Sequence, residues 1–439
     1  MTAPSVPSLP DRVGPADQAP AVDVARVQAR TVRTLIASQI IGGIGVASGI
    51  AVAVLAAEEL TGSASLAGLV QTAGVLGAAV AAVPLSRLMY RRGRRIGLVA
   101  AYLIAGAGAG ICLLSGVSSA YWLMLLGMSL YGVATAANLA ARYAATDLAE
   151  PSTRGRDLGL VVWATTIGAV LGPNLIEPGG ALGEWLGVPR LFGPYLIAFT
   201  GFLVAATTLA VRMRPDPLLT ARRRATELDT GDPQAGPQRS IGLREALLMI
   251  VRSPGARLGV LAVAVAHTVM VGVMVLTPVH MHHGGATLTI VGLVISVHVA
   301  AMFALSPLIG VWADRVGRVP VICVGQLILL ASALVSGTAS GHESAQLGIG
   351  LGLLGLGWSC CLVAGSTLIT ESVGLTYRPA IQGASDLVMG VSAAGGGALA
   401  GVVVGAYGYG VLNAAGAALA AVPLLVVIAR AIRGAPAAA

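Results

Sequence analysis

Charged residues are scarce in this sequence: they make up 10% of its 439 residues, whereas soluble proteins contain about 25%. Aromatic residues make up 4%, and lysine is absent, so that all 27 basic residues are arginine. Hydrophobic residues make up 56%, and the mean hydropathy is +0.84. This composition excludes a soluble enzyme, a nucleic-acid-binding protein and a secreted disulfide-rich domain. It predicts an all-α polytopic membrane protein that has the lipid bilayer as its partner.

Cysteines are also few, and their positions predict no disulfide framework. Cys112, Cys323, Cys360 and Cys361 all fall inside apolar stretches, and none has zinc-finger spacing. The segment 1–32 contains Pro, Asp and Arg but lacks the apolar core of a signal peptide, so it is predicted to be a disordered tail. No Ser-His-Asp or paired-carboxylate pattern appears, so we expect no enzyme activity.

Long apolar runs are plentiful, and twelve of them have roughly the 20 residues that a membrane-spanning helix needs. Their predicted positions are about 34–57, 66–88, 96–117, 121–145, 158–177, 192–211, 258–279, 287–311, 319–340, 345–370, 381–405 and 410–429. Residues 213–256 contain prolines and mixed charge, which predicts a linker with a short surface helix near 241–251. The linker separates a six-helix half at 33–212 from another at 257–430, and 431–439 form a second tail.

The positions of the arginines predict the orientation of the chain in the membrane. They cluster between the apolar runs at 91–95, 154–156, 212–257 and 315–318. The opposite loops hold one arginine, Arg190, and several glutamates. Positive charge marks cytoplasmic loops, so both termini are predicted to lie in the cytoplasm. The chain is expected to reside in the cytoplasmic (inner) membrane of a bacterium. We expect it to be a monomer. The net charge of +8 therefore indicates topology and no nucleic-acid partner.

The two halves repeat one another at an offset of 224 residues. The matched positions are Arg91 with Arg315, Gly93 with Gly317, Arg94 with Arg318, Arg154 with Arg378, and Gly159 with Gly383. Two separate loops share this one offset, which makes chance alignment a poor explanation. Parallel six-helix halves of this kind occur in major facilitator transporters.

A loop motif strengthens that resemblance. Residues 310–318 match the G-x-x-x-D-R-x-G-R signature between the second and third helices of a half, and the chain resembles the major facilitator superfamily over about 33–430. The resemblance implies the major facilitator fold, with an aspartate, Asp314, that caps a helix of the opposite half and holds a gate closed. In the first-half copy, Tyr90 replaces this aspartate, so symmetric gates are not expected. The gating set is Asp314, Arg315, Gly317, Arg318, Arg154 and Arg378, in which Arg315 and Arg318 are equally explained as topology anchors.

Histidine and methionine are concentrated in one stretch, which points to a substrate. Five of the six histidines and four of the 11 methionines lie within 267–302. Helical spacing puts His267, Met270 and Met274 on one face of the seventh helix, and His298 and Met302 on one face of the eighth. The outer loop between these helices is expected to contribute the remaining donors, His280, Met281, His282 and His283.

Thioether and imidazole together favour Cu(I), although methionine is also a common packing residue. The Met270-x3-Met274 and His298-x3-Met302 pairs resemble the motifs of the CcoA-like (CalT) copper importers. The resemblance implies that these four residues bind copper as transported substrate rather than as a cofactor. We add His267 as a ligand and the loop histidines as capture groups. The secondary ligands predicted are Met124, Met128, Cys360 and Cys361.

A proton-coupled exporter of drugs or small organic metabolites is the alternative. Gly159, Gly168, Gly172 and Pro173 reproduce most of the glycine-proline signature of major facilitator antiporters. Against it, methionine replaces the arginine that such exporters carry in the fourth helix. Two other ionisable residues, Asp386 and Arg142, are predicted either to couple protons or to form a structural salt bridge. A non-transporting sensor on the same fold is a third reading.

Overall fold

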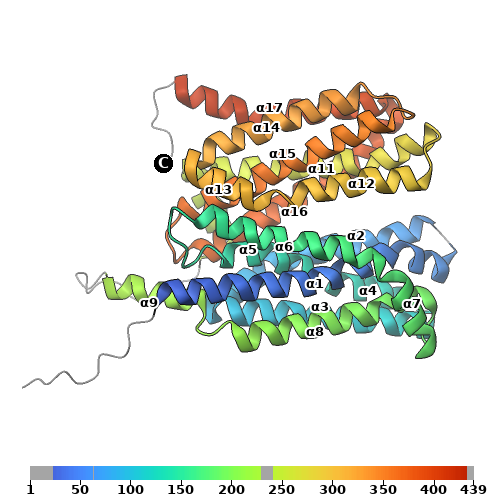
Figure 1. Cartoon of the computed structure of the whole chain (residues 1–439), viewed down its shortest axis with the longest axis horizontal. Helices are drawn as coiled ribbons and strands as arrows, with labels where there is room; N and C mark the ends of the chain where they lie inside the picture. Colours follow the sequence, from blue (N-terminus) through green and yellow to red (C-terminus); the bar gives the residue numbers. More distant parts are fainter. Residues whose placement is uncertain (1–22, 63, 229–240, 433–439) are drawn as a thin grey trace, which may run out of the picture.

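The computed structural model describes residues 23–62, 64–228 and 241–432, and every element in these ranges is helical. The helices are α1 (Val24–Thr61), α2 (Ala64–Arg92), α3 (Arg94–Ser118), α4 (Tyr121–Tyr131), α5 (Val133–Ala144), α6 (Arg154–Asn174), α7 (Ile176–Trp185), η1 (Arg190–Phe192), α8 (Pro194–Arg212), α9 (Pro217–Leu228), α10 (Leu243–Arg252), α11 (Pro254–His283), α12 (Leu288–Phe303), α13 (Ser306–Val316), α14 (Arg318–Gly337), α15 (Ser344–Glu371), α16 (Arg378–Tyr407) and α17 (Tyr409–Ile432) (Figure 1).

The helices match the predicted set of spans. Within the described residues, eleven are long and apolar enough to cross a membrane, and there are twelve if α6 and α7, which meet at a bend of 59°, count as one span. Two spans consist of two helices each: α4 and α5 meet at Gly132, and α12 is followed by α13. The predicted all-α fold with twelve spans in two six-helix halves is confirmed.

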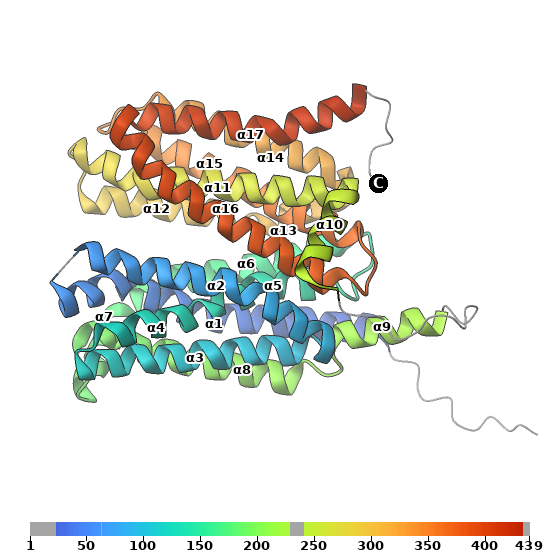
Figure 2. The same cartoon turned by 180° about the vertical axis from the view of Figure 1, so that it is seen from behind.

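The two halves lie side by side as separate bundles. Helices α1 to α8 form one and α11 to α17 the other (Figures 1 and 2). Each has its own buried apolar core; the core of the second half also includes Leu158 and Val162 of α6. Helices α9 and α10, the start of α1 and the end of α17 lie at one end of the bundles, which we call the linker end. Helix α7 lies at the opposite end, which we call the far end.

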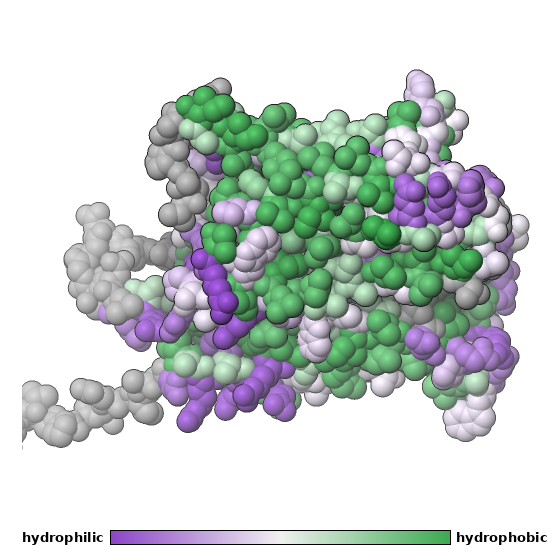
Figure 3. All heavy atoms as spheres, turned by 45° about the horizontal axis from the view of Figure 1, so that its top comes forward, coloured by the Kyte–Doolittle hydropathy of each residue, from purple (hydrophilic) through white to green (hydrophobic). Residues whose placement is uncertain are grey.

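The surface carries the polarity pattern of a membrane protein. Hydrophobic residues cover a broad band across the side of the molecule, and hydrophilic residues gather at its two ends (Figure 3). Many large apolar side chains are exposed, such as Val80, Leu308 and Val402, each about two thirds exposed or more. Water would make this exposure unfavourable, whereas lipid tails solvate it.

The structure corrects the predicted boundaries at two places. Residues 24–32, predicted as part of a disordered tail, are helical, because Asp23 caps α1 by accepting a hydrogen bond from the Arg26 amide (3.0 Å). The rest of that tail, 1–22, and most of the second tail, 433–439, lie outside the described residues. The linker contains the predicted surface helix, α10, but also α9, which was not predicted. Its start signal was present in Asp216 followed by a proline.

Candidate functional site

A central cavity lies between the two halves. It consists of two hollows, of about 180 and 280 Å³, that share Thr135, Leu139 and His267. The first half contributes α1, α2, α4, α5 and α6, and the second contributes α11, α12, α15 and α16. Glycines let the helices come close around it: a Cβ atom on Gly132 would meet the backbone of α2. The cavity has the size and position expected for a small-solute site.

The lining is mostly apolar and carries few polar groups. Its polar or charged side chains are Gln39, Gln71, Thr135, Asn138, Arg142, Thr165, His267 and Asp386. Aromatic rings come from Tyr131, Phe303 and Trp358. Phe303 and Trp358 meet edge to face, with centroids 5.6 Å apart and an interplanar angle of 86°. An apolar wall with a few convergent polar groups suits a small organic molecule better than a bare ion.

One buried ion pair joins the halves beside the cavity. Arg142 of α5 donates from Nη2 to Oδ1 of Asp386 on α16 at 2.6 Å, and both side chains are at most 10% exposed. Arg142 also donates from Nε to Ser366 on α15 (3.1 Å), and its Nη1 has no partner among the described residues. Removing either charge would leave the other buried and uncompensated, which makes the pair sensitive to protonation of the carboxylate.

His267 is held in one tautomer at the point where the two hollows meet. The Nε1–H group of Trp358 donates to its Nδ1 at 2.9 Å. Because an indole nitrogen can only donate, Nδ1 must carry the lone pair, and the neutral ring carries its proton on Nε2. His267 therefore acts as a hydrogen-bond donor at Nε2, and a metal can bind this atom only if the Trp358 bond breaks.

The other predicted metal ligands do not converge on the cavity. Met302 lines it, but Met270 is buried in the core of the second half, and Met274 packs against that core. His298 is fully buried, donates from Nδ1 to the Leu351 carbonyl (2.8 Å), and has no partner at Nε2 in the described part of the chain. Within the described residues, no three side chains of His, Cys, Asp or Glu come together as a metal site. Most of the predicted ligands on these two helices instead pack inside their own bundle.

The predicted capture loop is helical. Helix α11 continues to His283, so the loop histidines belong to its last turn. His280 stacks on the Tyr409 ring (centroids 4.2 Å apart), and its Nε2 lies 3.2 Å from the Ala339 carbonyl. Met281 is fully buried and His283 is exposed, while the side chain of His282 lies outside the description. This turn is thus tied to the second half and does not stand above the cavity as a free donor loop.

The predicted secondary ligands are all buried core residues, and one of them also lines the cavity. Met124 is fully buried in the first half, whereas Met128 lines the cavity and its sulfur accepts from the Tyr195 hydroxyl (3.5 Å). Cys360 and Cys361 are buried in the second half, and Gln326 donates to the Cys361 sulfur (3.4 Å). These cysteines do not line the described cavities.

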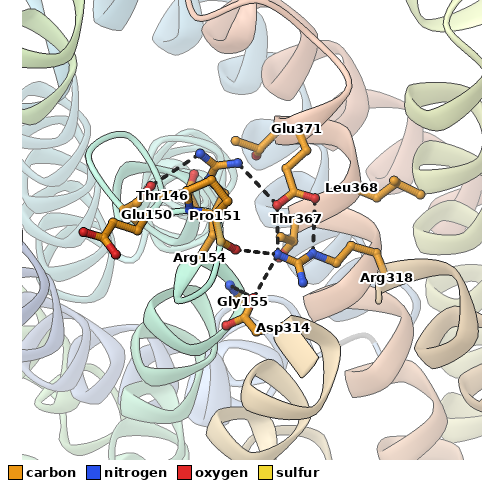
Figure 4. A network of polar contacts seen from close by, with 12 residues as sticks. Thr146, Glu150, Pro151, Arg154, Gly155, Asp314, Arg318, Thr367, Leu368 and Glu371 are labelled. Atoms are coloured by element: carbon orange, nitrogen blue, oxygen red, sulfur yellow. Dashed lines mark hydrogen bonds and ion pairs between the residues drawn. The ribbon is translucent and has the colours of Figure 1, made fainter. Parts of the chain in front are cut away.

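The linker end of the cavity is closed by a polar network that joins the halves (Figure 4). Asp314 of α13 accepts from the Gly155 amide (2.9 Å) and the Arg156 amide (2.8 Å) at the start of α6. Arg318 forms ion pairs with Asp314 (2.9 Å) and with Glu371 (2.8 Å). A carboxylate at a helix N-terminus is stabilised by the free amides and the helix dipole. The structure thus puts Asp314 where the motif predicted it.

Other members of the gating set have different environments. Arg154 reaches across from the first half to Glu371 (3.3 Å), so this glutamate binds arginines of both halves. Sequence reasoning missed Glu371, although Asp147 stands 224 residues before it and pairs with Arg94 (2.8 Å). Arg315 is exposed, which suits a topology anchor.

Two six-helix bundles around a cavity that is closed at one end define a secondary transporter. The Major Facilitator Superfamily model matches residues 34–285 and 259–438. The Bacillus subtilis (strain 168) protein named uncharacterized MFS-type transporter YddS is 36% identical over 401 residues, which cover 91% of this chain and 90% of that protein. The chain belongs to the Major Facilitator Superfamily, whose members are transporters rather than enzymes.

Two further proteins are similar to the chain. The riboflavin transporter RfnT of Brucella anthropi is 26% identical over 337 residues, covering 76% of this chain and 79% of that protein. A crystal structure of the E. coli fucose:proton symporter FucP superposes with a TM-score of 0.65 at 18% identity, covering 91% of this chain and 98% of that one. The likeness to FucP concerns the fold alone.

Proposed function

We propose that the protein carries a small organic solute with aromatic character across a bacterial cytoplasmic membrane by alternating access, coupled to protons. The observation that carries this proposal is the cavity lining. Its walls are apolar, with aromatic rings from Tyr131, Phe303 and Trp358. Among the described residues that line it, the charged side chains are Arg142 and Asp386, which pair with each other. The name of the relative RfnT, a riboflavin transporter, supports an aromatic solute.

The charge distribution supports a cytoplasmic linker end. Arginines crowd that end, in the helix ends around 91–95, 154–156 and 315–318 and in helix α9. At the far end, Arg190 is paired with both Glu177 and Glu184 of its own half, which leaves little free positive charge there. By the positive-inside rule, the linker end faces the cytoplasm. The conformation described is then closed on the cytoplasmic side, and its cavity receives solute from outside.

His267 supports an organic cargo with a hydrogen-bond acceptor. Its neutral ring is locked by Trp358 with the proton on Nε2, so it offers a donor to the cavity. A carbonyl or ring nitrogen on the solute would accept this bond while the ring faces of Trp358 and Phe303 pack against the solute. A polar contact of this kind gives specificity, because a solute that lacks the acceptor leaves a buried donor unpaired.

Asp386 is the proton carrier in this proposal. A proton on its carboxylate removes the charge that holds Arg142, and with it an ion pair between α5 and α16. Because the two helices belong to different halves, breaking the pair loosens the contact between halves. Protonation is thereby linked to the conformational change that moves the cavity from one side to the other.

Copper import remains a second candidate, favoured by one observation. His298 donates from Nδ1, so its Nε2 bears a lone pair, and this atom is buried one helical turn from Met302 with no partner among the described residues. Such a nitrogen suits Cu(I). His298 does not line the described cavities, however, and His267 has the wrong tautomer for a ligand at Nε2. An organic solute therefore accounts for more of the site.

Trp358→Phe separates the two candidates. The change keeps an aromatic ring but removes the indole N–H, which frees His267 to carry its proton on Nδ1. For an aromatic solute, with riboflavin as the first probe, we expect weaker uptake into proteoliposomes driven by an inward proton gradient. For copper, the same change makes Nε2 available, so copper uptake should be unchanged or stronger. Riboflavin and related flavins that neither bind nor enter, together with copper uptake that depends on His298, would overturn the organic-solute proposal.

A further inference from the structure

The first half lacks the acidic cap that closes the gate in the second. At the offset of 224 residues, Tyr90 occupies the position of Asp314, and Pro379 occupies the position of Gly155. Asp314 binds two backbone amides, one of them the Gly155 amide. Proline has no amide hydrogen, so an aspartate at position 90 would find one of these two donors missing. The positions that correspond to Asp314 and Gly155 therefore both hold residues that cannot form this contact.

A linker residue, Arg222, contacts Tyr90 at this position instead. Arg222 of α9 lies over the ring of Tyr90, with the guanidinium carbon 4.5 Å from the ring centroid. From Nη1 it donates to the Tyr90 carbonyl at 2.7 Å, and from Nη2 to the Thr376 carbonyl at 3.5 Å. Tyr90 lies in the last turn of α2 in the first half, and Thr376 precedes α16 of the second. One side chain therefore connects the two halves at the linker end.

The position of Arg222 is set by an anchor at the start of its helix. Asp216 accepts from the amides of Leu218 and Leu219 (3.1 and 3.2 Å), which caps α9. The same carboxylate accepts from the Arg95 amide at 2.8 Å, which attaches α9 to the first half at the start of α3. Helix α9 is thus fixed to one half and reaches the other through Arg222.

We propose that Arg222 is a positioning residue of the transport cycle, a latch on the linker that holds the linker end closed in place of the missing acidic cap. It acts by joining Tyr90 to Thr376 and so supports the contact of α2 with α16, as Asp314 supports that of α13 with α6. When the halves separate at this end, Thr376 moves away with the second half, and the bond to Arg222 breaks. This role of Arg222 is independent of which solute is carried.

The test measures the closed population directly. Spin labels on Arg92→Cys and Arg315→Cys, two exposed sites in opposite halves, report the separation at the linker end by pulsed EPR in proteoliposomes. The background carries Cys323→Ser, because the other three cysteines are buried. We expect Arg222→Gln to lower the ratio of short to long distances about fivefold, the effect of losing one cation–π contact with its hydrogen bonds. Arg223→Gln, on the neighbouring exposed arginine, should leave the ratio unchanged.

A rescue variant distinguishes a latch from general stabilisation of the linker. Tyr90→Asp with Pro379→Gly rebuilds the acidic cap and its missing amide in the first half. Added to Arg222→Gln, this pair should restore the short distances while α9 still lacks its arginine. Unchanged distances in Arg222→Gln would overturn the proposal, as would an equal effect of Arg223→Gln or a failure of rescue with Asp314 intact. None of these outcomes depends on which solute is carried.

Discussion

Gly155 is the position at which a single methyl group should reopen the linker end. A Cβ atom there would stand 2.7 Å from the Gly310 carbonyl oxygen and 2.8 Å from Oδ1 of Asp314. Both atoms belong to the opposite half, and neither can rotate away without losing the contact between α6 and α13. Overpacking of this kind costs about 1–3 kcal/mol. The cost falls only on the closed state, so Gly155→Ala should lower the ratio of closed to open molecules about 5- to 150-fold.

The measurement uses the same spin-label pair, Arg92→Cys with Arg315→Cys. The gain in helix propensity from alanine is shared by both states because α6 is helical in each, so it does not mask the effect. Gly405→Ala is the matched control, since a Cβ atom there meets nothing within 4 Å. Gly155→Ala should shift the distances and Gly405→Ala should not. Equal distances in both variants would refute the idea that α6 and α13 close the gate by backbone contact.

Three further predictions concern the gate, the proton pathway and stability. Asp314→Asn keeps the size but removes the charge at the N-terminus of α6, so the closed state should lose about 0.3–1 kcal/mol, read from the same EPR distances. Asp386→Asn removes the proposed proton site; we expect proteoliposomes to lose proton-driven uptake but to keep solute exchange without a gradient, and retained proton-driven uptake would exclude this role. Gly108→Ala places a methyl group 2.7 Å from the Gly127 carbonyl inside the first half, so thermal unfolding should shift downward while the EPR distances stay the same.

The sequence predicts the architecture well because the relevant signals are local. Apolar run length gives the spans, and the repeat at one offset gives the two halves. The position of Asp314 at a helix of the opposite half also follows from a short motif. Helix α9 shows that such signals are easy to miss: the run Arg222–Arg224 looks like a solvated linker, although Asp216 with the following proline is a helix start.

The site was harder to predict because helical spacing shows which residues share a face but not what that face meets. His267 and Met302 line the cavity, whereas Met270 packs into its own bundle, a difference that depends on where α15 and α17 lie. The decisive contact, from Trp358 to His267, joins residues 91 positions apart. No local sequence pattern predicts a contact between residues so far apart in the chain. Without that contact, the tautomer of His267 cannot be deduced.

If Asp386 carries the proton, as proposed, the charge balance of the cavity determines which gradients drive the cycle. With Arg142 and Asp386 paired, the described lining has no net charge. A proton on Asp386 leaves the guanidinium uncompensated, so the loaded carrier gains one positive charge. A neutral cargo would then move charge across the membrane, and the voltage would contribute about 2.3 kcal/mol per 100 mV. A cargo with one negative charge would move none, and only the pH difference and its own gradient would act on it.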